Sequence, residues 1–293
     1  MKISKTQKRI LYIAYIVLMT LFFLYYLFPA ESLKNYAVTK VHGINPQIRI
    51  TLDKVTPSFP LGLVLKDVSV YYEEKPVFEA QRLRLSPAFL PLLTGKSALK
   101  FKCHAYGGKI KGRAGVSLFG GGMDNLFAKA DLTDVQIGKV QALKTILPQY
   151  GLAGVLNGDI PYKADKKDKR TMTSNLTVTD SKVDFLIFFY GIETLSFKEV
   201  DVNLKLKDDI LTVEKFVSNS TDLGGNITGT VTLKTPFRRS KLDLEGDVTP
   251  GPAVLDKMEK LGPMVKMLLK SRPGNKGIPV RLTGTVERPG YFK

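Results

Sequence analysis

Apolar and polar residues alternate one by one along most of the chain beyond residue 45. In residues 194–207 the apolar series is Leu195, Phe197, Val200, Val202, Leu204 and Leu206. Such alternation places the apolar side chains on one face of a β-strand, and the slip between Phe197 and Val200 predicts a β-bulge. The same period recurs at residues 48–52, 175–179, 226–233, 241–244 and 280–286. We therefore predict a mainly β protein, built on a long curved antiparallel sheet with tight turns.

Helical spacing replaces this alternation in a few segments beyond residue 30. Residues 135–147 place three apolar side chains on one face and stop before Pro148. Residues 253–269 carry apolar residues at alternating spacings of four and three, with a kink expected at Pro263. A shorter helix is predicted at residues 87–93. The sheet should therefore be accompanied by two or three short helices.

An uncharged apolar run occupies residues 10–28. As a helix it would be about 28 Å long, close to the roughly 30 Å of a bilayer's hydrocarbon core. We predict a single transmembrane helix here, with the anchor side chains Ile10, Val17, Phe22 and Phe28. The alternative is a cleaved signal peptide. The length of the run and the lack of a small-residue cleavage site behind it favour an uncleaved anchor.

Four basic residues precede the apolar run, namely Lys2, Lys5, Lys8 and Arg9. Positive charge beside a membrane-spanning helix favours the cytoplasmic side. We therefore expect residues 1–30 to form a cytoplasmic basic tip and a membrane anchor. The rest of the chain should lie across the membrane.

Basic residues outnumber acidic ones over the chain as a whole. The formal net charge is +17, and +13 remains without the four residues before the anchor. Such an excess suits anionic lipid headgroups or acidic partner surfaces, whereas a location across the membrane argues against nucleic acid. The alternative is a solvated basic surface without a specific partner. The densest cluster, Lys163–Arg170, is predicted to be an exposed loop.

Two parts of the chain carry similar signatures in the same order. A Gly-Gly-x-Ile-x-Gly signature occurs at residues 107–112 and again at 224–229. A strand of the type Leu-Lys-Asp-Val-Ser-Val precedes each copy, and a helical segment and a closing strand follow it. This order predicts an internal duplication, with one β-rich repeat in residues 31–165 and a second in residues 166–293.

Residue patterns typical of catalysis are missing from the sequence. The glycine signature lacks the spacing of a nucleotide-binding loop, so a hairpin turn or bulge explains it better. His42 and His104 are the only histidines and have no metal-ligand spacing. The carboxylate pairs at 73–74 and 208–209 fall in predicted turns. We expect no enzyme activity, cofactor or metal, and we expect the single cysteine, Cys103, to be a buried strand residue.

One strand-sized segment, residues 185–190, is apolar at both parities. A strand of this kind is covered on both faces. It either lies in a core beneath helices or lines an apolar groove for an acyl chain. The core is favoured; a groove would be lined by Phe185, Ile187 and Phe189.

Two longer segments resemble a known family. Residues 55–70 read Val-Thr-Pro-Ser-Phe-Pro-Leu-Gly-Leu-Val-Leu-Lys-Asp-Val-Ser-Val, and residues 277–292 read Gly-Ile-Pro-Val-Arg-Leu-Thr-Gly-Thr-Val-Glu-Arg-Pro-Gly-Tyr-Phe. With the basic tip, the apolar run and the glycine signatures, they resemble the type II secretion system protein N (GspN) family over essentially the full chain. Residues 59–68 also resemble the start of AsmA-like proteins, which are anchored in the inner membrane and extend a β-sheet groove into the periplasm.

The resemblance implies a single-pass protein of the bacterial cell inner membrane with its C-terminal domain in the periplasm. It would be a non-enzymatic assembly or scaffold component of a type II secretion system, with other secretion subunits as partners. The alternative is an AsmA-like lipid-binding or lipid-transfer module, whose groove would hold phospholipid or lipopolysaccharide acyl chains. The full-length resemblance favours the first. Roughly 20 strands, about 4.8 Å apart, would reach at most about 100 Å, which suits a module better than a full bridge between membranes.

Overall fold

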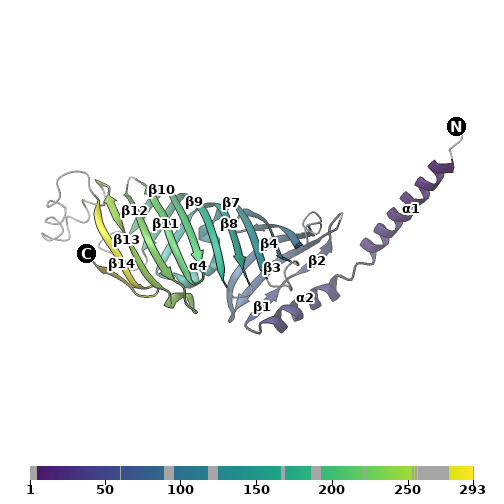
Figure 1. Cartoon of the computed structure of the whole chain (residues 1–293), viewed down its shortest axis with the longest axis horizontal. Coiled ribbons are helices and arrows are strands. Elements are labelled where there is room, and N and C mark those ends of the chain that lie inside the picture. The colour runs from purple at the N-terminus through teal and green to yellow at the C-terminus, as the bar shows by residue number, and fades with distance from the viewer. Residues whose placement is uncertain are drawn as a thin grey trace.

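The computed structural model describes residues 5–59, 61–88, 96–117, 125–165, 169–185, 193–220, 222–252, 254, 256 and 277–292, with some side chains in these ranges, including those of Leu21 and Leu24, not described. The strands follow one another in chain order along the long axis of the molecule (Figure 1). Helix α1 (Lys5–Tyr26) extends from one end, and the last strands lie at the other.

Fifteen strands of the described residues form one antiparallel sheet. From β3 to β15 each strand pairs with the next in the sequence, while β1 and β2 lie one after the other along β3. Their bounds are β1 Ile48–Thr51, β2 Lys54–Pro57, β3 Leu63–Tyr72, β4 Lys75–Pro87, β5 Lys96–Ala105, β6 Gly108–Ser117, β7 Asn125–Gln136, β8 Tyr150–Ala164, β9 Arg170–Phe185, β10 Thr194–Lys207, β11 Ile210–Asn219, β12 Leu223–Thr232, β13 Lys241–Pro250, β14 Ile278–Thr285 and β15 Pro289–Phe292.

This arrangement confirms the predicted long antiparallel sheet. The strand count is lower than expected because many strands are long; β9 alone has 16 residues. At about 4.8 Å per strand the sheet spans roughly 60 Å. The bulge predicted between Phe197 and Val200 is not found there, because the register against β9 is unchanged from Phe197 to Glu199. A register shift against β11 lies between Asn203 and Leu204 instead, where Glu214 of β11 is the extra residue.

Besides α1, the described residues contain helices α2 (Ala30–Ile44) and α4 (Gln141–Ile146) and the 3₁₀ turns η1 (Ile137–Lys139) and η2 (Phe237–Arg239). The helix predicted at residues 135–147 is therefore shorter than expected. Val135 is buried and pairs with Leu156 in the sheet, so strand pairing overrides the helical spacing there. Pro87 ends β4, and the remainder of the helix predicted at 87–93 lies, after Ala88, outside the described residues, as does most of 253–269.

Helix α2 was not predicted. Its Leu33, Ala37 and Val41, spaced four residues apart, are partly buried, and the helix packs against β1 and β2. The Lys34 ammonium donates a hydrogen bond to the carbonyl oxygen of Asp53, at 3.0 Å. This four-residue spacing of apolar residues could have predicted the helix from the sequence, although the helix is short and its other side is polar.

The carboxylate pairs lie in two-residue turns, as predicted. Glu73 and Glu74 connect β3 to β4 with φ values of 48° and 63°. The pair at 208–209 connects β10 to β11 in the same way. The loop predicted at 163–170 is shorter than expected, because β8 runs to Ala164 and β9 begins at Arg170, and residues 166–168 lie outside the described residues. The Lys169 N–H donates to the Asp165 carboxylate at 3.0 Å. Asp165 and Lys169 are exposed, as are the carboxylates of both turns.

The two glycine signatures differ in structure. In the first, Tyr106 and Gly107 form a two-residue hairpin loop with φ values of 54° and 77°, which confirms the predicted turn. In the second, the glycines at 224–225 lie inside β12 and the turn precedes them. The register between β11 and β12 shifts opposite residues 226–229, so this copy marks an irregularity in the pairing instead.

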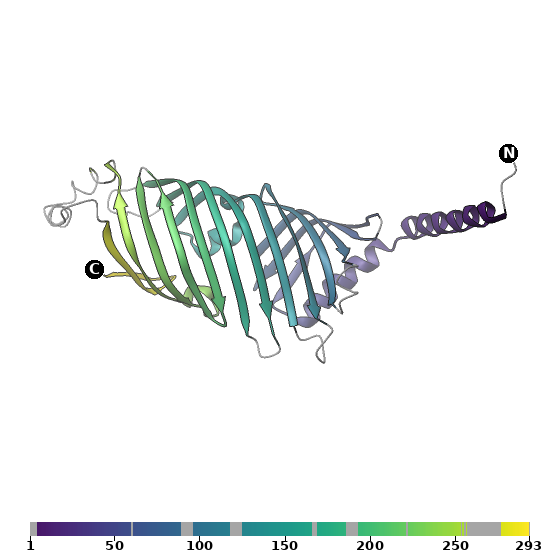
Figure 2. The ribbon, with the colours of Figure 1, turned by 45° about the horizontal axis from the view of Figure 1, so that its top comes forward.

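Curvature of the sheet follows from the position of α4. This helix contacts both β4 and β8. In a flat sheet these strands would be about 19 Å apart, whereas six helical residues span about 9 Å. The sheet is curved in both views (Figures 1 and 2), and this curvature brings β4 and β8 toward α4. The small residues Ala80, Cys103 and Ala105 in the cluster beneath α4 allow this close approach.

The predicted boundary between the two repeats falls in the loop between β8 and β9. These strands pair along most of their length, so the sheet runs through this point without interruption. The internal duplication stays a prediction.

Candidate functional site

The strand register sorts the side chains of the sheet onto two chemically different faces. Paired residues in adjacent strands share a face. Pairing aligns Cys103 with Ile110 and Ile110 with Leu132. Farther along the sheet it aligns Leu176 with Val202. We call this side, on which α4 lies, the apolar face. Further members are Leu65, Leu83, Leu99, Ala114, Ala128, Ile160, Met172, Leu204, Val213, Leu242, Leu244 and Leu282.

Near β4 and β8 the apolar face is closed. A cluster of buried residues lies beneath η1 and α4: Ala80, Cys103, Ala105, Tyr106 and Val135, with Val140 packed against it. The Tyr106 hydroxyl accepts a hydrogen bond from the Glu79 N–H at 2.9 Å, and its ring meets Phe78 edge-on, with centroids 6.1 Å apart. Cys103 lies in β5 and is buried, which confirms the predicted buried strand cysteine. Burial raises the pKa of its thiol to about 11 and so keeps the thiol neutral.

Toward the C-terminal end the described residues cover the apolar face less completely. In β13 exposure alternates strictly, and Leu242, Leu244 and Val248 are only partly buried. No described side chain of β13 or β14 is fully buried. Leu99 and Leu126, near the strand ends in the first half, expose 51% and 46% of their surface. An apolar surface extending along most of the sheet is therefore partly accessible.

Phe185, a predicted groove residue, lies at the end of β9. It packs with Leu195 and Val254, and its ring meets Tyr150 edge-on at 5.8 Å between centroids. This supports the core interpretation for Phe185. Ile187 and Phe189 lie outside the described residues, so a groove at this strand stays a prediction.

The predicted anchor forms α1. Ile10, Val17 and Phe22 expose 62%, 53% and 57% of their surface. Phe28 differs, because it follows the end of α1 and packs against the core cluster that contains Leu52. Lys5, Lys8 and Arg9 lie in the first turns of α1, and Lys2 is outside the described residues.

Within the part of the chain that the structure describes, no helix meets the combined length and hydropathy expected of a membrane span. The transmembrane helix and the topology predicted from the sequence therefore lack structural support.

The other side of the sheet, the polar face, has two distinct halves. From β9 to β14 several of its charges are paired: the Lys215 ammonium lies 3.2 Å from Asp201, and the Arg281 guanidinium lies 3.1 Å from Asp243. At two positions a lysine and a threonine side chain donate hydrogen bonds to the same carboxylate. Hydrogen bonds from Lys215 and Thr177 lower the pKa of Asp201, and bonds from Thr194 and Lys182 lower that of Asp184.

From β4 to β6 the polar face instead stacks like charges. Arg84 pairs with Lys102, and Lys102 with Lys111. Two residues along the strands in one direction, Lys100 lies opposite Arg113. Two residues along in the other direction, His104 lies between Arg82 and Lys109. We call these seven cations the basic ladder: Arg82, Arg84, Lys100, Lys102, Lys109, Lys111 and Arg113. All are exposed, and none makes an ion pair with a described carboxylate. Like charges directly opposite each other destabilise a sheet by about 0.2–1 kcal/mol per pair.

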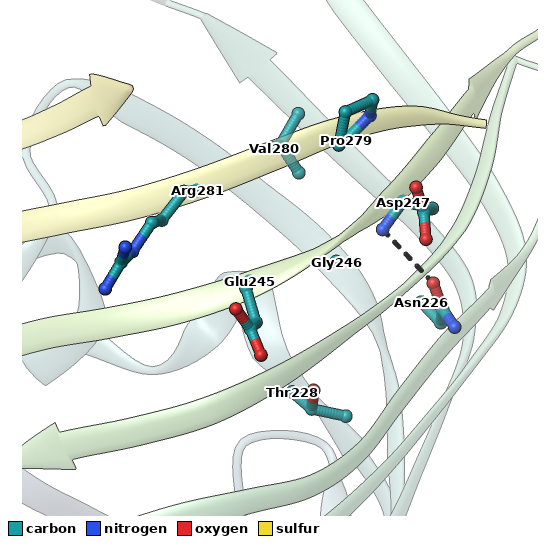
Figure 3. Close-up of a pocket in the computed structure, with 8 residues that line it drawn as sticks. All are labelled: Asn226, Thr228, Glu245, Gly246, Asp247, Pro279, Val280 and Arg281. Atoms are coloured by element: carbon teal, nitrogen blue, oxygen red, sulfur yellow. Dashed lines mark hydrogen bonds between the residues drawn. The ribbon is translucent and has the colours of Figure 1, made fainter. Parts of the chain in front are cut away.

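A shallow cavity of about 390 Å³ lies on the polar face across β12–β14 (Figure 3). Glu245, Asp247 and Arg281 line it, and the Asp247 N–H donates to the Asn226 side-chain oxygen at 3.2 Å. Among the described residues no three histidine, cysteine or carboxylate side chains gather as a metal site requires. His42 lies in α2 and His104 on the polar face of β5, so they belong to different surfaces. The cavity presents hydrogen-bonding groups without a recognisable catalytic set.

The apolar face and the basic ladder were not predicted as sites. Alternation revealed the apolar side of each strand, but only the register joins these sides into one surface.

Comparison of the chain with protein-family models, with curated proteins and with solved structures finds no match.

Proposed function

We propose that this protein is a membrane-anchored lipid-binding module whose apolar sheet face shields acyl chains from water. The observation that carries the proposal is the apolar face, whose mostly apolar side chains extend from β3 to β14 and are partly accessible beyond α4. A large accessible apolar surface on a protein marks a binding site for an apolar partner.

The dimensions and energies are consistent with an acyl chain. A chain in one leaflet spans about half of the roughly 30 Å hydrocarbon core. The sheet, at roughly 60 Å, could accommodate several such lengths in succession. Each methylene removed from water contributes about 0.8 kcal/mol, so a long acyl chain needs no specific polar contact to bind.

The proposal includes α1 as a single transmembrane anchor. The complete run of residues 10–28 has no charged residue, and the described side chains of α1 are largely exposed. An exposed apolar helix of this length is stable in lipid and unfavourable in water. The basic residues before it support a cytoplasmic N-terminus, with the sheet across the bacterial inner membrane in the periplasm. A reporter fused behind Lys293 should be active on the far side; activity confined to the cytosol would contradict this topology.

Lipid binding can be tested by native mass spectrometry of the full chain released from detergent micelles. Leu244→Lys places a charge on the apolar face at a partly buried position and should reduce co-purified lipid several-fold. Thr228→Lys, on the polar face of the next strand and opposite Glu245, is the matched control. A wild-type protein free of lipid, or equal lipid in both variants, would contradict the proposal.

A second candidate is an assembly component of a type II secretion system. The resemblance to the GspN family supports it, and so does the edge of the sheet: among the described residues β15 pairs with β14 alone. An unpaired edge can accept a strand from another protein. Gentle crosslinking in membranes followed by pull-down should recover other secretion subunits, and their absence would count against this role.

A further inference from the structure

Two cavities lie next to each other near the C-terminal end of α1. The first, of about 710 Å³, is apolar and is lined by Phe23, Leu27, Phe59 and Leu63 among others. The second, of about 350 Å³, combines the ladder cations Arg84, Lys100, Lys102 and Lys111 with apolar surface that includes Phe101. Leu61 and Pro87 line both cavities, so the cavities adjoin, and we call them together the two-part site.

The loop between β2 and β3 joins the two parts. Phe59 and Leu61 in this loop expose 73% and 48% of their surface. The Arg84 guanidinium donates a hydrogen bond to the carbonyl oxygen of Phe59 at 2.7 Å. This contact holds the apolar loop against the basic ladder and leaves other guanidinium N–H groups available for a ligand.

We propose that this two-part site binds an anionic glycerophospholipid at the membrane surface, with its phosphate on the basic ladder and its acyl chains in the apolar cavity. The inference rests on the proposed function, since it assumes that α1 is in the membrane and places the site where the sheet meets the bilayer. It names the lipid class and the point of entry.

Charge and shape both favour this ligand. An unpaired cluster of lysine and arginine is complementary to a phosphate, and arginine can bind phosphate with two parallel hydrogen bonds. The cations stand opposite one another across strands, so an anion bound between them relieves their repulsion. A nucleic acid would satisfy the same charges but would leave the adjoining apolar cavity exposed. A glycerophospholipid carries both groups in one molecule.

The experiment compares two double variants of the full chain with the same change in net charge. Lys102→Gln with Lys111→Gln removes two cations of the basic ladder that face each other. Lys205→Gln with Lys215→Gln removes two cations from the paired half of the polar face. Phosphatidylglycerol and phosphatidylcholine are each added to the detergent-solubilised protein, and the bound fraction is read by native mass spectrometry.

We expect phosphatidylglycerol binding to fall at least tenfold in the ladder variant, since each membrane-proximal cation contributes about fivefold. In the control variant it should change less than twofold. Leu61→Asp, at an exposed position, should also weaken binding, because the acyl chains lose their cavity. Binding should decrease with rising salt.

Equal losses in the two double variants, or no preference for phosphatidylglycerol over phosphatidylcholine, would overturn the inference. Complete displacement by millimolar glycerol phosphate would identify a general anion site, and tighter binding of a single-stranded oligonucleotide would identify a nucleic-acid surface; either result would also overturn it. If these measurements contradict the inference while Leu244→Lys still reduces co-purified lipid, the proposed function stands without this entry site. If Leu244→Lys has no effect either, both fail.

Discussion

The strands before the middle of the sheet and those after it share one construction but differ in cover and in charge. Around β4–β8 the apolar face closes over a buried cluster beneath α4, and from β4 to β6 the polar face stacks unpaired cations. Around β9–β14 the apolar face is only partly covered by described residues, and several charges of the polar face form ion pairs. The buried cluster and the ion pairs stabilise the sheet, whereas the unpaired cations and the partly open apolar face do not.

The closed apolar face and the paired charges both stabilise the folded sheet. Stability does not explain the like charges that stand opposite each other, which weaken a sheet, or the partly open apolar face. A partner that neutralises the basic ladder would account for the first feature, and one that covers the open apolar face would account for the second. Four measurements would test this contrast.

The largest effect is expected from a charge placed on the apolar face. Ala105→Asp, at a fully buried position beneath α4, should lower the free energy of unfolding by about 3–5 kcal/mol, because the carboxylate has no partner there. Leu244→Asp, in the partly covered half, should cost about 1 kcal/mol, since water reaches the new charge. Urea unfolding followed by far-UV circular dichroism gives both values. Equal losses would remove the distinction between the closed and open parts.

Thiol chemistry tests the closed half directly. A pKa of about 11 leaves the Cys103 thiol about a hundredfold less ionised near pH 8 than a cysteine of ordinary pKa. We expect alkylation of the folded protein to be slower than that of the urea-unfolded protein by at least this factor. Mass spectrometry of iodoacetamide-treated protein measures it. Fast labelling of the folded chain would mean that the cluster beneath α4 opens readily.

Charge reversal should act oppositely in the two halves. Lys102→Glu, between Arg84 and Lys111, replaces repulsion by attraction and should stabilise the protein by about 0.5–1 kcal/mol. Asp201→Lys removes the partner of Lys215 and should destabilise it by a similar amount. Both effects should shrink in high salt. Destabilisation by Lys102→Glu would argue that the basic ladder has a structural role.

The smallest effect concerns acid pH. Asp184 and Asp201 have lowered pKa values in the folded protein, because hydroxyl and ammonium groups bond their carboxylates. Their contribution to stability is complete above the unfolded pKa near 4 and is lost as the pH falls through the lower folded value. Asp201→Asn should therefore lose less stability than the wild type between pH 5 and pH 3, as read from urea midpoints. An unchanged pH dependence would mean that these bonds are too weak to matter.

Much of the fold was accessible from sequence because it depends on local patterns. Alternation at residues 241–244 marks the apolar side of β13, and the acidic pair at 208–209 marks a two-residue turn. The helix predicted at 135–147 was wrong in its first half because Val135 finds a strand partner 21 residues away, and such pairing has no local signature. Helix α2 was missed because its stability comes from packing on β1 and β2.

The mainly β character, the turns and the apolar run before the sheet follow from the chemistry of neighbouring residues, so they can be read from the amino-acid sequence. The composition also shows a large positive charge, but it does not show where the charge lies. The opposition of the lysines and arginines of β4–β6, and the apolar cavity that adjoins them beside α1, emerge only when the chain folds. Strand register causes this, because it aligns residues distant in sequence, and a shift of one residue would have turned each side chain to the opposite face.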